Sequence, residues 1–183
     1  IKYRNSSLAE SLIKSGMNLH YIESNADSTL SMTIREGLDY YTKKLLEMGA
    51  DPNFVGDNQH NPLARAVIQG NLEIVKLLVD KYKADLNLIK FNWSILHYAA
   101  TYNRNGEITK FLLAAGANPN ISIDGQTPLS IALQNRNSSD TIRLLTEASN
   151  KQIKGEAEKR DATIGNEHRQ TDAKILAERE SEK

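Results

Sequence analysis

The chain has 183 residues, 39% hydrophobic and 25% charged, which suits a folded domain or a short repeat array. Lys plus Arg and Asp plus Glu both total 23, so no net charge would draw the chain to nucleic acid or an anionic membrane, and we expect neither partner. The absence of cysteine excludes disulfides, thiolate metal sites and a cysteine nucleophile. No apolar run is long enough to span a bilayer, and no signal peptide is visible.

One short phrase recurs at a period near 33 residues. It reads GADPN at 49–53, KADLN at 83–87 and GANPN at 116–120. A period of this length is typical of proteins built from stacked repeats, in which each unit buries its apolar face against its neighbours.

In chain order, each unit contains two segments with helical patterns. We predict a short first helix in each unit, at 28–37, 61–70, 94–103 and 127–136. Two of these begin with an N-cap residue followed by proline at the first helical position, Asn61-Pro62 and Thr127-Pro128. We predict an amphipathic second helix in each unit, at 40–48, 73–82, 107–115 and 138–149.

Glycines close several of these helices, where a left-handed residue is needed: Gly37, Gly49, Gly70 and Gly116. The second unit departs from the pattern because Tyr82 and Lys83 stand where the glycine belongs, with one residue too many. We therefore expect this turn to be reshaped. The third unit carries one extra residue between its two helices, in TYNRNGE.

Taken together, these slots resemble the ankyrin repeat. The segments that carry the resemblance are TPLSIAL, ILHYAA with NGEITKFLLAAGANPN, and NPLARAV with GNLEIVKLLVDKYKADLN, and it covers roughly residues 6–149. It implies an all-α solenoid of stacked helix-turn-helix units. We assign a partial N-terminal capping repeat to 1–23, ankyrin repeats to 24–56, 57–89 and 90–122, and a C-terminal capping repeat to 123–149.

The charged tail at 150–183 allows two interpretations. From Ser149 onward 16 of 35 residues are charged, in equal numbers of each sign, which is typical of a solvated linker. However, Ile153, Ile164 and Ile175 recur every eleven residues, or three helical turns, among good helix formers. We favour a helix.

The sequence contains no pattern of residues that indicates chemistry. The four histidines lie in separate units without the i, i+4 spacing of a helical metal site, and no Gly-rich phosphate loop or GxSxG motif is present. We therefore expect no catalysis, metal, cofactor or small-molecule substrate. His97 occupies the histidine slot of the ankyrin pattern, where it would bond to nearby backbone and hydroxyl groups. The resemblance also implies that Asn87 and Asn120 can be hydroxylated by an asparaginyl hydroxylase.

The resemblance implies a binding surface for a protein partner, because in ankyrin proteins the loop tips and the inner faces of the first helices form a concave groove. By slot, the candidate residues are His60, Arg65, Ile68, Gln69, Phe91, Trp93, Tyr98, Tyr102, Asp124, Gln126 and Asn135. We place the centre at Phe91 and Trp93, whose rings occupy a loop tip that carries small residues in ordinary repeats, and exposed aromatic residues are typical of binding hot spots. In the alternative interpretation Trp93 folds back over the first helix, and the tyrosines at 98 and 102 pack in the fold.

The leading hypothesis is a non-enzymatic protein-interaction module. In a second hypothesis the chain is the targeting arm of a larger enzyme or of a secreted bacterial effector, since it begins at Ile1 and is expected to be a piece of something longer. In a third, it is a scaffold that self-associates through the tail. We expect a cytoplasmic location, which would be the host cytoplasm for an effector.

Overall fold

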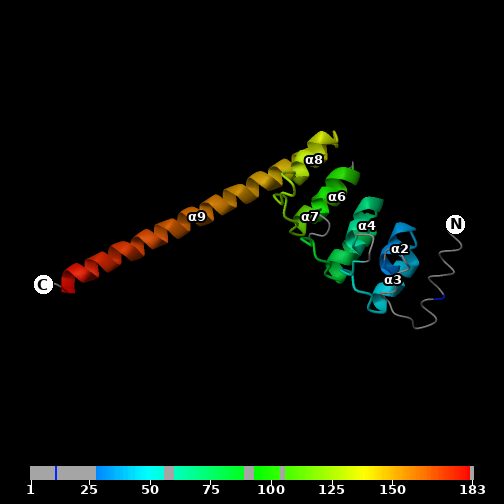
Figure 1. The fold of residues 1–183 in the computed structure, drawn as a ribbon, viewed down its shortest axis with the longest axis horizontal. Helices are drawn as coiled ribbons and strands as arrows, with labels where there is room; N and C mark the ends of the chain where they lie inside the picture. The colour runs from blue at the N-terminus through cyan, green and yellow to red at the C-terminus, as the bar shows by residue number, and fades with distance from the viewer. Residues whose placement is uncertain (1–10, 12–27, 56–59, 89–92, 104–105, 182–183) are drawn as a thin grey trace. The chain divides into compact units, whose positions relative to one another are not determined.

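The computed structural model describes residue 11 and residues 28–55, 60–88, 93–103 and 106–181 (Figure 1). The chain divides into two compact units, Ile1–Leu145 (unit 1) and Thr146–Lys183 (unit 2). Within the described ranges every regular element is a helix. The prediction of an all-α fold is confirmed.

The helices of unit 1 form two rows. The first row contains α2 (Thr29–Arg35), α4 (Pro62–Gln69), α6 (Ile95–Tyr102) and α8 (Pro128–Gln134). The second row contains α3 (Asp39–Glu47), α5 (Leu72–Lys76) with the π-helix η1 (Leu77–Lys81), α7 (Glu107–Ala114) and the first turns of α9 (Ser139–Ser181). Each first-row helix packs against the next one, and α2, α4 and α6 also pack against the second-row helix that follows (Figure 1). This is the arrangement of a solenoid.

The first-row helices begin at polar caps. Asn61 Oδ1 accepts a hydrogen bond from the amide of Ala64 at 2.6 Å, and Thr127 Oγ1 caps α8 in the same way. Each cap satisfies a backbone donor that would otherwise lack a partner inside the helix. Ser28, in a repeat that has no proline at the first helical position, still caps α2 through a bond from the Ser31 amide at 3.1 Å.

The π-helix η1 accommodates the extra residue of the second repeat, at 57–89. The amide of Tyr82 donates to the carbonyl of Leu77 at 3.3 Å, a bond that spans five residues instead of four. Lys83 then adopts φ of 56°, in the slot where Gly49 and Gly116 have φ of 93° and 101°. The prediction of a reshaped turn is confirmed, and the adjustment lies in the helix as well as in the turn.

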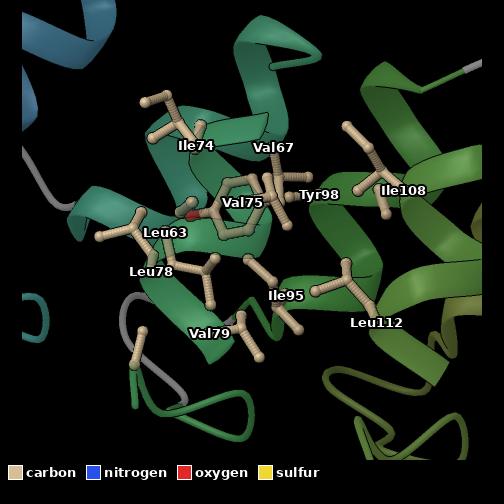
Figure 2. Close-up of a cluster of buried hydrophobic side chains, with 14 of the residues drawn as sticks. Leu63, Val67, Ile74, Val75, Leu78, Val79, Ile95, Tyr98, Ile108 and Leu112 are labelled. Carbon is tan, nitrogen blue, oxygen red and sulfur yellow. The ribbon is translucent and has the colours of Figure 1, made fainter. Parts of the chain in front are cut away.

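The core of unit 1 runs continuously through the stack because each helix pair leaves an apolar side that only its neighbour can cover. Figure 2 shows Leu63 and Val67 of α4 with Ile95 of α6 and Leu112 of α7 in one cluster, and all four are 5% exposed or less. Burial of this kind contributes about 1.5–3 kcal/mol for each large aliphatic side chain.

Buried asparagines link each of two first-row helices to the previous one. Asn103 Nδ2 donates to the carbonyl of Val67 at 2.8 Å, and Asn137 Nδ2 donates to the carbonyl of Ala100 at 2.6 Å. Both asparagines are less than 9% exposed. These bonds join neighbouring repeats in addition to the apolar contacts.

The helix α9 does not stop where the other second-row helices do. Ser149 lies 33 residues after Gly116, in the position where a glycine ends α3 and α7. Ser149 is helical and does not adopt the left-handed conformation that ends a helix. The helix therefore continues to Ser181, which confirms the prediction of a helical tail. In unit 2, Ile153 and Ile164 are 57% and 44% exposed.

Candidate partner-binding surface

The first-row helices and the loops that precede them form the first-helix face, which contains the predicted binding residues. Five of these residues are exposed: Gln69, Tyr102, Asp124, Gln126 and Asn135. Four are half-buried: His60, Arg65, Ile68 and Trp93. Tyr98 is buried. Phe91, predicted as half of the aromatic centre, lies outside the described residues. The binding assignment itself stays a prediction.

Four rings gather near the start of α6: those of Trp93, His97 and Tyr98, and that of His60 from the loop before α4. The ring centroid of Trp93 lies 5.2 Å from that of Tyr98 and 6.1 Å from that of His97, and the ring of His60 lies 5.3 Å from Tyr98. Trp93 is half-buried and packs against the core, which is the geometry of the alternative in which it folds back over the first helix. Part of the indole still faces outward, so packing and binding are compatible for this residue.

The two tyrosines of α6 differ although they lie one helical turn apart. Tyr98 is 8% exposed and belongs to the buried hydrophobic cluster (Figure 2), whereas Tyr102 is 52% exposed. Burial raises the pKa of the Tyr98 phenol, as does the nearby Tyr102, while Arg65 acts in the opposite direction. Tyr102 is therefore the aromatic side chain that α6 presents to solvent.

A tight hairpin presents the last loop tip. Ile123 and Gln126 exchange backbone hydrogen bonds of 2.9 Å, and the two residues between them have φ of 51° (Asp124) and 76° (Gly125). Two positive φ angles in a two-residue loop are the mark of a type I′ turn, for which Asp-Gly is a favoured sequence. The turn holds Asp124 and Gln126 at the exposed edge of the face.

Polar side chains of the face form hydrogen bonds to neighbouring elements. Gln69 Nε2 donates to the carbonyl of Arg35 at 3.1 Å, and Gln126 Nε2 donates to Gln134 Oε1 at 3.4 Å. Holding these side chains in the free protein lowers the conformational entropy that binding would cost.

The repeated asparagines connect successive loops. The amide of Asn87 donates to Asp85 Oδ1 at 2.8 Å, and Asn87 Oδ1 accepts from the amide of Asn118 in the next repeat at 3.1 Å. Asn53 and Asp85 form the same inter-repeat bond at 2.8 Å, and Asn120 bonds to Asn118 within its own loop. The recurrence of the phrase thus has a structural cause, while hydroxylation of Asn87 and Asn120 stays a prediction.

His97 has the structural role that was predicted for it. Its Nδ1 accepts from the backbone amide of Ser94 at 3.3 Å and lies 2.6 Å from Ser94 Oγ, while Nε2 lies 3.1 Å from the carbonyl of Gln126. These partners fit a neutral ring with its proton on Nε2. Burial lowers the pKa of His97, and the bond to the Gln126 carbonyl partly opposes this shift.

In the part of the chain that the structure describes, no group of three or more His, Cys, Asp or Glu residues could hold a metal ion. Over the same residues, none of the helices has the length and apolar character required to cross a membrane.

The helical pairs, the loop bonds and the histidine cap together define a repeat stack of the ankyrin class. A family model of ankyrin repeats in three copies matches residues 1–90 and 82–156. The chain belongs to the ankyrin repeat family. Ankyrin repeats are generally protein-interaction modules and are typically non-catalytic.

Curated relatives share parts of the chain. The transient receptor potential cation channel subfamily A member 1 homolog of Caenorhabditis elegans is 35% identical over 114 residues, which cover 60% of this chain and 9% of the relative. Alpha-latroinsectotoxin-Lt1a of Latrodectus tredecimguttatus is 39% identical over 90 residues, 48% of this chain and 6% of the toxin. The Notch-regulated ankyrin repeat-containing protein of Xenopus tropicalis is 44% identical over 62 residues, 33% of this chain and 53% of that protein. The chain thus spans less than a tenth of the first two relatives and about half of the third.

Sequence reasoning missed the buried asparagines at 103 and 137. A signal was present, since Asn71, Asn103 and Asn137 all follow the end of a first-row helix. It also missed the type I′ turn, which the Asp124-Gly125 pair predicts.

Proposed function

We propose that unit 1 is a non-enzymatic module that binds a protein partner through the first-helix face. The observation that carries this proposal is Tyr102, a large aromatic side chain that is 52% exposed beside the cluster of Trp93, Tyr98 and His60. Tyr and Trp are enriched among hot-spot residues because they bury much area at a small cost in entropy.

A matched pair of tyrosine variants tests the proposal. Tyr40 of α3 is 66% exposed, is in the second row and lies outside the first-helix face, so Tyr40→Ala controls for the loss of an exposed ring. We expect Tyr102→Ala to weaken binding of a partner isolated by affinity capture by more than about 2 kcal/mol, or roughly 30-fold, without lowering the melting temperature. Equal affinities for the two variants would contradict the proposal.

The role of the half-buried Trp93 is tested by measuring both the melting temperature and the affinity for the partner. Trp93→Ala is expected to lower both the melting temperature and the affinity, because its ring packs against the core as well as facing outward. A large fall in melting temperature with unchanged affinity would assign Trp93 to packing alone.

A second candidate function is that of a targeting arm within a larger protein. The alignment with the nematode channel subunit homolog supports it, since the matched segment is 9% of that relative. The full reading frame tests it, because a further domain with catalytic or membrane-spanning motifs would be recognisable there. The bacterial-effector form of this hypothesis and the cytoplasmic location remain predictions, and microscopy of a tagged full-length chain would test the location.

The third candidate, self-association through the tail, depends on the exposed Ile153 and Ile164 of unit 2. Replacing Ile164 with Glu would lower the solution mass of an oligomer that pairs through this stripe. An unchanged monomeric mass for both chains would remove the candidate.

A further inference from the structure

The second-row helices carry a groove that is separate from the first-helix face. It lies between α5 and α7, has a volume of about 240 Å³, and is lined by Leu72, Lys76, Glu107, Lys110, Phe111 and Ala114. This volume lies below the range of sites for drug-sized ligands and suits one or two side chains of a peptide. The lining combines apolar groups with two lysines and one glutamate.

The repeat pattern explains why this groove is open. In the previous repeat, Lys43 of α3 pairs with Glu73 of α5 at 2.6 Å, and Lys76 and Glu107 occupy the same two slots one repeat later. Lys76 does not form the equivalent pair. Its Nζ lies instead over the ring of Phe111, 5.9 Å from the centroid.

Two ammonium groups of the groove therefore have no carboxylate partner in the described part of the chain. Lys76 lies over the Phe111 ring, and neither Lys76 nor Lys110 forms an ion pair among the described residues. Leu72 and Phe111 are half-buried, so a guest could cover further apolar surface between the two charges. With two lysines against one glutamate, the lining is net positive, which favours an acidic segment with an apolar centre.

We propose that the groove between α5 and α7 binds an acidic segment of a partner protein that presents an aromatic or branched aliphatic side chain between Asp or Glu residues. The apolar side chain covers Leu72 and Phe111, and the flanking carboxylates pair with Lys76 and Lys110. Glu107, on the same wall, repels carboxylates, so the acidic residues of the segment lie at the two lysines and away from Glu107. This second surface would let one stack hold two partners at once.

The test is an NMR titration of the full chain, labelled with ¹⁵N, with a capped six-residue peptide that has Phe and Leu at its centre and Asp and Glu at its ends. We expect saturable shifts at the amides of α5 and α7 that weaken as ionic strength rises. Two control peptides carry either Lys in place of the acids or Ser in place of Phe and Leu, and both are expected to bind much more weakly.

Charge-reversal variants locate the contact. Lys110→Glu and Lys76→Glu are each expected to weaken binding by about fivefold, the upper range for one exposed ion pair, and Lys154→Glu in α9 supplies the same charge change outside the groove. The proposal is overturned if no saturable shifts occur at α5 and α7, if either control peptide binds as well as the acidic one, or if all three variants bind alike. None of these outcomes depends on Tyr102, so this proposal and the first-helix proposal can fail separately.

Discussion

The buried asparagine that joins α6 to α4 gives the sharpest test of how the repeats are coupled. Asn103 is 5% exposed, and its Nδ2 donates to the carbonyl of Val67 at 2.8 Å. Asn103→Ala removes this bond and leaves a small cavity. The carbonyl of Val67 keeps one donor, the amide of Gly70 at 3.0 Å, so the mutation does not leave it without a partner.

The lost hydrogen bond and the cavity set the expected loss in the free energy of unfolding. Loss of a buried hydrogen bond costs about 1 kcal/mol, and the cavity raises the total to about 1–3 kcal/mol. For a chain of this size this corresponds to a fall in melting temperature of roughly 2–12 °C. Asn135→Ala is the matched control, because Asn135 is exposed at the end of α8 and its loss is expected to change stability by less than about 0.5 kcal/mol.

The assay uses urea unfolding followed by the fluorescence of Trp93, the single tryptophan of the chain, which lies just before α6. It therefore reports on unit 1 without a signal from the tail helix. If Asn103→Ala and Asn135→Ala have the same urea midpoint, the bond between repeats contributes nothing measurable and the reasoning is refuted.

Three further predictions concern backbone strain, pH and the tail. Lys83→Gly is expected to raise the free energy of unfolding by about 0.5–1 kcal/mol, because φ of 56° costs a side-chain-bearing residue more than glycine; an unchanged urea midpoint would contradict this. Burial lowers the pKa of folded His97 below 6.5, so the unfolded chain binds the proton at a higher pH than the folded chain does. The contribution of His97 to the free energy of unfolding should therefore be fully present above pH 6.5 and fall as the pH drops toward the folded pKa. Urea midpoints from pH 8 to pH 5 test this, and a His97→Gln variant with the same pH dependence would exclude His97 as the cause. Gly155→Ala should stabilise α9 locally by about 1 kcal/mol, since an added Cβ meets nothing within 4 Å, and unchanged amide exchange in unit 2 would argue against it.

Local signals made much of the fold predictable. The caps at Asn61 and Thr127 are confirmed because capping depends on residues within one helical turn. The glycine slots are confirmed for the same reason, since φ of 93° at Gly49 and 101° at Gly116 is a property of a single residue. The missing glycine at Ser149 likewise accounts for the long α9, although it was not used to predict that length.

Contacts between repeats were harder to predict. Asn103 and Asn137 reach carbonyls 36 and 37 residues earlier, so their partners emerge only once the stack is assembled. The different burial of Tyr98 and Tyr102 has the same origin. Helical spacing places both on one side of α6, but the rings of Trp93 and His60, from the preceding loops, lie against Tyr98.

The measurement that tests the central claim most directly is site-specific photocrosslinking in cell lysate. A photoreactive phenylalanine analogue replaces either Tyr102 on the first-helix face or Tyr40 on α3, which are 52% and 66% exposed. Binding through the first-helix face predicts a discrete crosslinked protein adduct at position 102 that position 40 does not give. An adduct at position 40 with none at position 102, or equal adducts at both, would contradict the account.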